Sequence, residues 1–346
     1  MPDTKIVREP LTGPAAWRGE DLTPEDYLYE LSDEEVTAII SLRDDLTARG
    51  VGLGQIDPDS APVPGMASAI AEWLDRLEDG IGFVVVRGLD IDDWTERQAG
   101  LAYYALGRQM GVPVKQNAAG HLLGHVRDTG KDIFTDPSAR GYQVRIGLPF
   151  HTDTSTDLLS LMCLQTAKEG GESALAPLQT VYNEVLARRP GLIDTYYETF
   201  DFDCRDEEHP DGGPYYTRVL ASVGPDGKFS LRHNSGYAKS APFRFEDVEP
   251  LSENKVELLD LVDQLTHDPA IHVRFRLERG DMIFINNYAV AHSRSAFEDH
   301  DDPARKRHLL RLWLVLHQGR DLAPDFDNRA GIETTADVVE DGLAPA

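Results

Sequence analysis

Residues 142–166, YQVRIGLPFHTDTSTDLLSLMCLQT, contain two apolar runs, 142–150 and 157–166, on either side of a short polar stretch. Short runs rich in apolar and β-branched residues predict strands. Further runs of this kind, separated by Gly, Pro and Asp, occur at residues 229–233, 271–277, 281–286 and 308–317. Short strands without alternating helices argue against a parallel nucleotide-binding sheet and favour an antiparallel sandwich or barrel.

The first third of the chain is mainly helical by the same criteria. Ser32 and Glu35 form a capping box before a helix predicted over about 33–48, and two further helical stripes follow before residue 112. Between those two stripes, the run 82–88 predicts a short strand. In the β-rich half, two amphipathic segments predict helices that cover the sheets, at residues 180–189 and 252–265.

Together these elements predict a single domain over residues 1–346, mainly β with flanking helices and therefore of the α+β class. Its parts are a mainly helical segment over about 30–115, a β core over about 140–320, a helical insertion over about 180–265 and an acidic tail over 321–346. The tail holds seven carboxylates and one arginine, so we expect it to be solvated.

The composition limits the possible partners. The 60 acidic side chains outnumber the 34 basic ones and give a formal charge of −26, which repels nucleic acids and anionic membranes. No stretch approaches the ~18 apolar residues of a membrane span, and the amino terminus lacks an apolar signal core. The two cysteines form no disulfide framework, which suits the cytoplasm. We therefore expect a small-molecule partner, and a homo-oligomer remains open.

The tripeptide His151-Thr152-Asp153 places an imidazole and a carboxylate on one side of an extended chain, because side chains at i and i+2 of a strand share a face. Two further His-x-Asp patterns, at 209–211 and 300–302, lie in polar loops where solvated side chains are the natural interpretation. Only His151 ends an apolar strand. Metal ligation and a hydrogen-bonded core histidine explain it equally well at this point.

A third ligand would favour the metal, since two imidazoles and one carboxylate define a non-haem iron(II) site with three open positions. His272 alternates with arginines and should face solvent, His308 lies opposite Arg311 in strand parity, and His317 lies too far along the strand. His292 follows the apolar run of GDMIFINNYAVA, whose end would carry its imidazole inward. The alternative is a structural histidine at a strand end.

Arg311 shares a strand face with Trp313 and Val315, and a guanidinium in an otherwise apolar strand needs an anionic partner. An internal carboxylate would satisfy it, and so would the carboxylate of a 2-oxo acid co-substrate gripped by two hydrogen bonds. Ser173, after the turn at 168–172, could supply a hydroxyl to the same carboxylate, although Gly170-Gly171 also suits an ordinary tight turn.

Four motifs resemble the taurine dioxygenase and clavaminate synthase-like branch of iron(II)/2-oxoglutarate-dependent oxygenases, and the match runs from about residue 82 to 320. They are LPFHTD (148–153), GGES (170–173), GDMIFINNYAVAHSR (280–294) and RHLLRLWL (307–314). The resemblance implies a double-stranded β-helix, or jelly roll. It also implies that the iron ligands and catalytic residues are His151, Asp153 and His292, and that the residues binding 2-oxoglutarate are Arg311, Ser173 and Arg307. Clavaminate-type members often carry Glu where this chain has Asp153.

The activity implied by this resemblance consumes 2-oxoglutarate and dioxygen, releases succinate and carbon dioxide, and oxidises a carbon of a small carboxylate or amino-acid-like molecule. The outcome, whether hydroxylation, desaturation, ring closure or loss of a heteroatom group, depends on how the substrate is positioned. Arg145 shares strand parity with His151, and Asp157 shares it with Asp153, so both are candidate substrate contacts. A surface ion pair would explain Arg145 as well, and a structural hydrogen bond would explain Asp157. A mononuclear metal hydrolase and a catalytically silent binding protein remain as alternatives.

Overall fold

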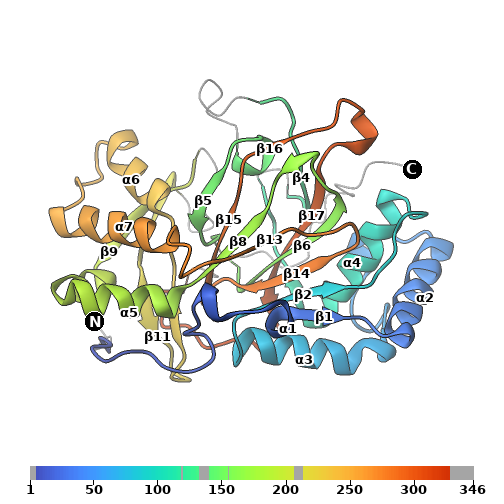
Figure 1. Cartoon of the computed structure of the whole chain (residues 1–346), viewed down its shortest axis with the longest axis horizontal. Helices are drawn as coiled ribbons and strands as arrows, with labels where there is room; N and C mark the ends of the chain where they lie inside the picture. Colours follow the sequence, from blue (N-terminus) through green and yellow to red (C-terminus); the bar gives the residue numbers. More distant parts are fainter. Residues whose placement is uncertain (1–4, 118–119, 132–139, 155, 206–212, 328–346) are drawn as a thin grey trace.

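A computed structural model describes residues 5–327 of the chain except 118–119, 132–139, 155 and 206–212. In it, the motif 280–294 folds into two consecutive strands that belong to different sheets, β14 (Met282–Asn286) and β15 (Val290–Arg294). The short turn between them carries the chain from one sheet to the other (Figure 1). Such a crossing between two sheets agrees with the jelly roll that the resemblance implied, whereas the residues alone predicted one apolar strand ending at His292.

The larger sheet has seven strands in the order β1-β2-β14-β6-β17-β3, with β4 also paired to β17. All of its pairings are antiparallel except the parallel pair of β1 and β2. Its remaining strands are β1 (Leu28–Glu30), β2 (Phe83–Arg87), β3 (Gly111–Pro113), β4 (Leu123–Val126), β6 (Leu158–Gln165) and β17 (His308–Leu316). The run 82–88 of the helical segment is therefore part of the β core.

The smaller sheet has four antiparallel strands in the order β13-β8-β15-β5. Its other members are β5 (Leu148–His151), β8 (Ser173–Pro177) and β13 (Val273–Phe275). Side chains of both sheets meet in one buried cluster, in which Leu159 and Ile283 of the larger sheet join Leu175 and Val290 of the smaller one. The two sheets thus face each other and form an open jelly roll, as the resemblance implied.

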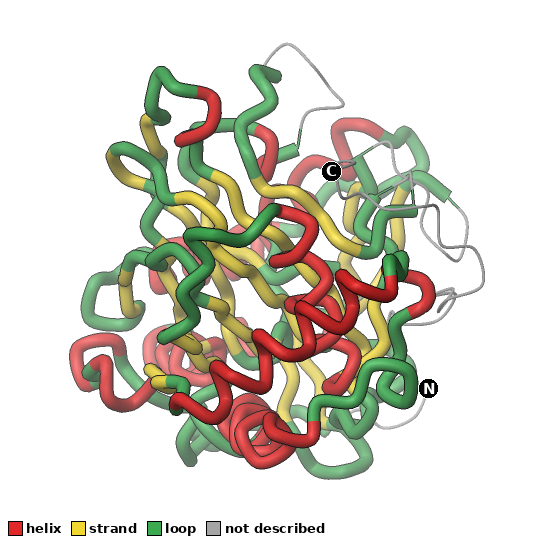
Figure 2. Tube along the Cα trace, turned by 90° about the vertical axis from the view of Figure 1, so that its right-hand side faces the viewer, coloured by secondary structure: helices red, strands yellow, loops and turns green. Residues whose placement is uncertain are grey.

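Three helices cover the outer face of the larger sheet (Figure 1), namely α2 (Asp33–Arg49), α3 (Ala67–Glu78) and α4 (Glu96–Met110). In the turned view of Figure 2, helices lie in front of the strands. The starts of α2 and α4 are encoded locally. At α2, Ser32 accepts from the backbone of Glu35 while the Glu35 carboxylate accepts from the backbone of Ser32. Thr95 and Gln98 make the same reciprocal cap on α4. All three helices agree with the sequence prediction.

A second helical layer covers the smaller sheet, with α5 (Leu178–Arg188), α6 (Ser235–Arg244) and α7 (Glu253–Thr266). The sequence predicted α5 and α7 but not α6, which contains Pro242 and has few apolar residues to reveal its period. Shorter elements complete the chain. They are α1 (Pro24–Tyr27), the hairpins β9 (Thr199–Asp203) with β10 (Tyr215–Val219) and β11 (Ala221–Val223) with β12 (Phe229–Leu231), the pair β7 (Glu169–Gly170) with β16 (Phe297–Glu298), and 3-10 turns at 19–21, 53–55, 64–66, 141–143, 190–197 and 303–305.

The beginning of the acidic tail packs against the core, in contrast to the solvated tail that the sequence predicted from Asp321. Leu322 and Phe326 are buried, and the ring of Phe326 lies edge-on to Tyr288 with the centroids 5.7 Å apart. The remainder of the tail, 328–346, lies outside the described residues. Among the described helices, none combines the length and the apolar character needed to cross a membrane.

A buried ion pair joins β2 to the loop before β14. The Arg87 guanidinium donates to both carboxylate oxygens of Asp281 at 3.0 and 2.7 Å, and the Asp281 side chain is only 2% exposed. Burial opposes the charge of Arg87, but the hydrogen bond from Arg87 to Asp281 outweighs it and raises the pKa of Arg87. The pair therefore fixes the amino-terminal segment to the jelly roll.

Removing this arginine should destabilise the protein. We expect Arg87→Ala to lower the free energy of unfolding by about 3 kcal/mol, because it leaves the carboxylate of Asp281 buried without its partner. Urea unfolding would measure the change. The exposed pair of Arg8 and Asp194 is the matched control, since Arg8→Ala should cost less than about 1 kcal/mol. Equal losses in the two variants would contradict the structural role of Arg87.

Candidate active site

Two histidines predicted as ligands lie opposite each other on neighbouring strands. In the antiparallel register of β5 and β15, His151 pairs with His292, and the ring centroids are 4.2 Å apart. Cross-strand neighbours point to the same face of a sheet, so both imidazoles project from the smaller sheet at one point. Residues that are 141 positions apart in the chain thus share a site because of this one pairing.

Asp153 completes a cluster with the two imidazoles. It lies two residues after the end of β5, and its two carboxylate oxygens are each 3.9 Å from an Nε2 atom, one of His151 and one of His292. One potential ligand atom from each residue lies within 4.8 Å of the others. Two nitrogens and one carboxylate oxygen, gathered on one side of a common point, are the donor set of a non-haem iron(II) centre with open positions.

The protonation of the two histidines also suits metal binding. Nδ1 of His151 lies 2.8 Å from the carbonyl oxygen of Pro149, which can only accept, so Nδ1 carries the proton and Nε2 keeps its lone pair. Burial, together with the neighbouring imidazole, lowers the pKa of His292 to about 3. His292 is therefore neutral at neutral pH, and the contact of His151 with Pro149 directs the His151 Nε2 atom toward the carboxylate of Asp153.

Asp153 is held by groups from the larger sheet. The indole Nε1 of Trp313 donates to its Oδ2 atom at 2.8 Å, and the Asn287 side chain accepts from its backbone N–H and donates to its carbonyl. Burial alone would raise the pKa of Asp153, but the neighbouring imidazoles and the guanidinium of Arg311 outweigh it and hold the pKa below its usual value. The carboxylate is thus ionised and oriented.

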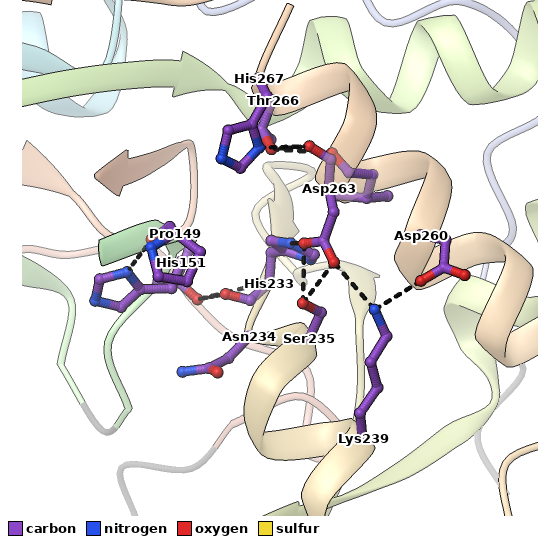
Figure 3. Close-up of polar contacts among 12 residues, drawn as sticks. Pro149, His151, His233, Asn234, Ser235, Lys239, Asp260, Asp263, Thr266 and His267 are labelled. Atoms are coloured by element: carbon purple, nitrogen blue, oxygen red, sulfur yellow. Dashed lines mark hydrogen bonds and ion pairs between the residues drawn. The ribbon is translucent and has the colours of Figure 1, made fainter. Parts of the chain in front are cut away.

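Thr152 lies between the two predicted ligands His151 and Asp153 and is bound to a polar network from the second helical layer. Figure 3 shows this network around His233 and Asp263. The Thr152 backbone N–H donates to the carbonyl of His233 at 2.7 Å, and its hydroxyl accepts from the His233 N–H. The buried His233 ring lies 2.8 Å from the Asp263 carboxylate, which also accepts from Ser235 and Lys239. Burial would raise the pKa of Asp263, but these partners lower it to about 2.

Arg311 projects from β17 on the same face as Trp313. Its Nε donates to the Gln116 amide oxygen at 2.7 Å, and its guanidinium carbon lies 4.8 and 4.3 Å from the ring centres of Tyr142 and Trp313. Among the described residues, no carboxylate lies within 4.0 Å of this guanidinium. Arg311 therefore reaches the interior next to Asp153, held by neutral groups.

Two further arginines, Arg307 and Arg294, lie together beside Phe297. Both guanidinium groups are buried and flank the ring of Phe297, at 5.1 and 4.8 Å from its centre. Burial lowers the pKa of Arg307 to about 10, and burial with the nearby charge of Arg307 lowers the pKa of Arg294 to about 9. Nη1 of each group is buried without a hydrogen-bond partner among the described residues.

Ser173 belongs to this arginine cluster. It pairs with Arg294 in the register of β8 and β15, so the two side chains share a face. Gly171, two residues earlier, has a φ of +72°, and a Cβ there would lie 3.0 Å from Nε of Arg307. The Gly-Gly turn thus permits a left-handed conformation and makes room for the arginine. The structure therefore brings Ser173 and Arg307 into one neighbourhood.

The two residues suggested as substrate contacts have structural partners. Arg145 is largely exposed and lies 3.0 Å from the carboxylate of Asp128. Asp157 is 1% exposed, and its oxygens accept from the Tyr288 hydroxyl and the Leu316 backbone N–H. These are the surface ion pair and the structural hydrogen bond that the sequence left open.

The other histidines lie away from this cluster. His317 contacts the carbonyl of Arg108, and His308 belongs to a separate group on the outer face of β17. His300 lies in the loop before residue 303, and His209 lies outside the described residues. The expectation that His272 faces solvent is wrong, because the end of α7 covers it and its Nδ1 lies 3.0 Å from the Thr266 carbonyl.

Several supporting residues were missed by sequence reasoning. Trp313 could have been found, because strand parity already placed it beside Arg311, facing the interior. Asn287 follows β14 directly, and paired amides at a strand end are a usable local signal. The link between His233 and Asp263 spans 30 positions and gave no local signal, and neither did the contact of Gln116 with Arg311.

Comparison with known proteins agrees with this geometry. The family described as "Taurine catabolism dioxygenase TauD, TfdA family" matches residues 49–313. FR-33289 synthase of Streptomyces rubellomurinus is 30% identical over 342 residues, which cover 96% of this chain and 98% of that protein. Taurine hydroxylase-like protein SAT17 of Stachybotrys chartarum is 28% identical over 317 residues, 86% of this chain and 77% of that protein.

Solved structures show the same fold at low sequence identity. An asparagine oxygenase in complex with Fe(II), 2S,3S-3-hydroxyasparagine and succinate superposes with a TM-score of 0.64 at 18% identity, over 84% of this chain and 93% of that one. The non-heme iron oxygenase OrfP with Fe and alpha-ketoglutaric acid gives 0.61 at 19% identity, over 83% and 94%. The family match and the His-Asp-His cluster lead to one conclusion: this chain belongs to the TauD/TfdA family and is an iron(II)/2-oxoglutarate-dependent dioxygenase.

Proposed function

We propose that His151, Asp153 and His292 hold the catalytic iron(II), and that the enzyme oxidises an unactivated carbon of a small carboxylate or amino-acid-like molecule. The observation that carries this proposal is the convergence of both imidazoles on an ionised, oriented carboxylate inside the jelly roll. Iron(II) held by these three residues would supply the chemistry that couples oxidative decarboxylation of 2-oxoglutarate to oxidation of the substrate.

The chain itself orients the ligands and holds the anionic groups. Pro149 fixes the tautomer of His151, Trp313 fixes the rotamer of Asp153, and the His233 segment holds the backbone between them. Such contacts behind the ligands tune the affinity for metal. The aromatic and aliphatic side chains shared by the two sheets exclude water from the region behind the site.

Arg311 and Arg307 are the two candidates for binding the distal carboxylate of 2-oxoglutarate. The sequence assigned this role to Arg311, with Ser173 and Arg307 as further contacts. Burial and an unpartnered Nη1 favour Arg307, which lies by the turn that carries Ser173. We therefore assign the distal carboxylate to Arg307 with Ser173. Arg311 lies beside Asp153 and is assigned to an anionic group nearer the iron.

The substrate class rests on this positive charge and on the relatives. The solved complexes of asparagine oxygenase and OrfP contain 3-hydroxyasparagine and (3S)-hydroxy-L-Arg, both hydroxylated amino acids. An anion near Arg311 is compatible with a substrate of this kind, and hydroxylation is the reaction that we favour. The family match gives no support to a metal hydrolase or to a silent binding protein.

Two cysteines without a disulfide support a cytoplasmic location.

The ligand assignment predicts a specific loss of metal. We expect His151→Ala, Asp153→Ala and His292→Ala each to abolish iron retention and 2-oxoglutarate turnover while the fold survives, because each variant removes an anchoring ligand. Iron content of the purified variants and succinate release measure the effect. His300→Ala is the control and should keep both. Retention of iron by His292→Ala, with its loss in His317→Ala, would overturn the assignment.

The hydrogen bond from Trp313 should matter to the metal rather than to the fold. We expect Trp313→Phe to weaken iron(II) affinity by about 10-fold or more, because the carboxylate of Asp153 loses its orienting donor. Anaerobic titration with iron(II) and 2-oxoglutarate, followed by the visible charge-transfer band, measures it. Trp94→Phe, in the outer helical layer, makes the same substitution away from the site. Equal iron affinities of the two variants would contradict the role of Trp313.

Substitutions of Arg307 and Arg311 should change different kinetic constants, namely the KM for 2-oxoglutarate and the KM for the primary substrate. Each charge-assisted hydrogen bond contributes about 1.5–3 kcal/mol, so Arg307→Lys, which loses the planar fork, should raise the KM for 2-oxoglutarate by roughly 10-fold or more. Iron content should stay unchanged, because a guanidinium is not a ligand. Arg311→Lys should act mainly on the primary substrate. The reverse pattern, with 2-oxoglutarate dependence altered only in Arg311→Lys, would return the distal carboxylate to Arg311.

A further inference from the structure

Three side chains from three elements meet on the outer face of the larger sheet. They are Glu96 at the start of α4, His125 in β4 and His308 at the start of β17. Nδ1 of His125 lies 2.9 Å from Nε2 of His308, and each imidazole has an Nδ1 atom 3.6 Å from a Glu96 oxygen. One nitrogen or oxygen atom from each residue lies within 4.8 Å of the others.

This cluster is separate from the iron site, because successive side chains of a strand point to opposite faces. Leu309 of β17 belongs to the core between the sheets, and Arg311 and Trp313 share its face. Leu310 and Leu312 belong to the core under α2, α3 and α4. His308 has the parity of this second set, so the sheet itself lies between the two clusters.

Within the described part of the chain, the carboxylate of Glu96 lacks a hydrogen-bond donor or a cation at one of its oxygens. Oε1 of Glu96 is buried without a hydrogen-bond partner, and among the described residues its recorded ion-pair contacts are the two histidines alone. A buried carboxylate oxygen without a donor is costly.

We propose that Glu96, His125 and His308 form a second metal site, which takes a divalent transition ion of the zinc class. Two imidazole nitrogens favour such an ion over Mg²⁺ and Ca²⁺, which prefer oxygen ligands. In the donor set of Glu96 Oε1, His125 Nδ1 and His308 Nε2, the separations of 3.6 and 2.9 Å from the His125 nitrogen bracket the ~3.3 Å between ligands that bonds of ~2.0–2.1 Å to tetrahedral zinc require. The Glu96 side chain is 31% exposed, which leaves room for water as the fourth ligand.

A metal ion here would connect α4 to both β4 and β17 at the edge where β17 begins. That edge also carries Arg307, which precedes His308 and points to the other face of the sheet. The site therefore ties the outer helical layer to the strand that supplies the inner arginines. The arginines near His308 oppose a cation, so we expect an affinity below that of a fully anionic site.

Zinc stoichiometry of the full-length protein tests the proposal, because variants of the two clusters remove the two bound equivalents separately. Chelator-stripped protein is loaded with Zn²⁺, gel-filtered and analysed for bound metal. We expect two equivalents in the wild type and in His300→Asn, and one equivalent in His125→Asn and in Glu96→Gln. His151→Ala should also retain one, and its double variant with His125→Asn should retain none.

Thermal unfolding separates loss of the site from loss of the fold. In the His151→Ala background, Zn²⁺ should raise the Tm, and adding Glu96→Gln should remove that shift while leaving the metal-free Tm unchanged. Glu96→Gln keeps the side-chain shape at a partly exposed position. The proposal is overturned if the wild type retains only the equivalent that His151→Ala removes, or if a second equivalent survives both His125→Asn and Glu96→Gln.

Discussion

The pairing of β5 with β15 is the constraint on which the active site depends. Antiparallel register sets His151 opposite His292, and a slip of one residue would turn one imidazole to the other face of the sheet. The register is irregular immediately after this pair, between His292 and Arg294. Packing of β15 against β8 on its other side holds the strand in place through five paired positions. The ligand geometry is thus a consequence of sheet formation rather than of local sequence.

The third proposed ligand, Asp153, connects the site to both sheets. Asp153 belongs to the chain that leaves the smaller sheet, yet its carboxylate is oriented by Trp313 of the larger sheet. Its backbone is held by Asn287, in the turn where the chain crosses between the sheets. Any change in the separation of the sheets would therefore move Asp153 relative to the imidazoles, so the apolar core between the sheets also contributes to metal geometry.

Features with a short-range cause could be predicted from the sequence, and features that arise from tertiary contacts could not. The capping box at Ser32 predicted the start of α2, and strand parity about His151 predicted its neighbour Asp153, because both signals span four residues or fewer. The prediction for His272 failed because parity within a strand ignores the covering helix α7. The network of His233 with Asp263 joins α7 to a loop, and no periodicity encodes such a contact.

The distribution of charge explains how so acidic a protein can bind a dicarboxylate. The formal charge of the chain is −26, but Arg294 and Arg307 are buried side by side and share the ring of Phe297. Their lowered pKa values remain well above neutrality, so both stay cationic, and the charge of Arg307 disfavours that of Arg294. A carboxylate bound between them would supply acceptors to their unpartnered N–H groups and relieve the repulsion. The two guanidinium groups are desolvated when the protein folds, so binding of the co-substrate does not require their desolvation. In the proposed function, the hydrogen bonds that they form to the carboxylate therefore contribute more fully to the affinity for 2-oxoglutarate.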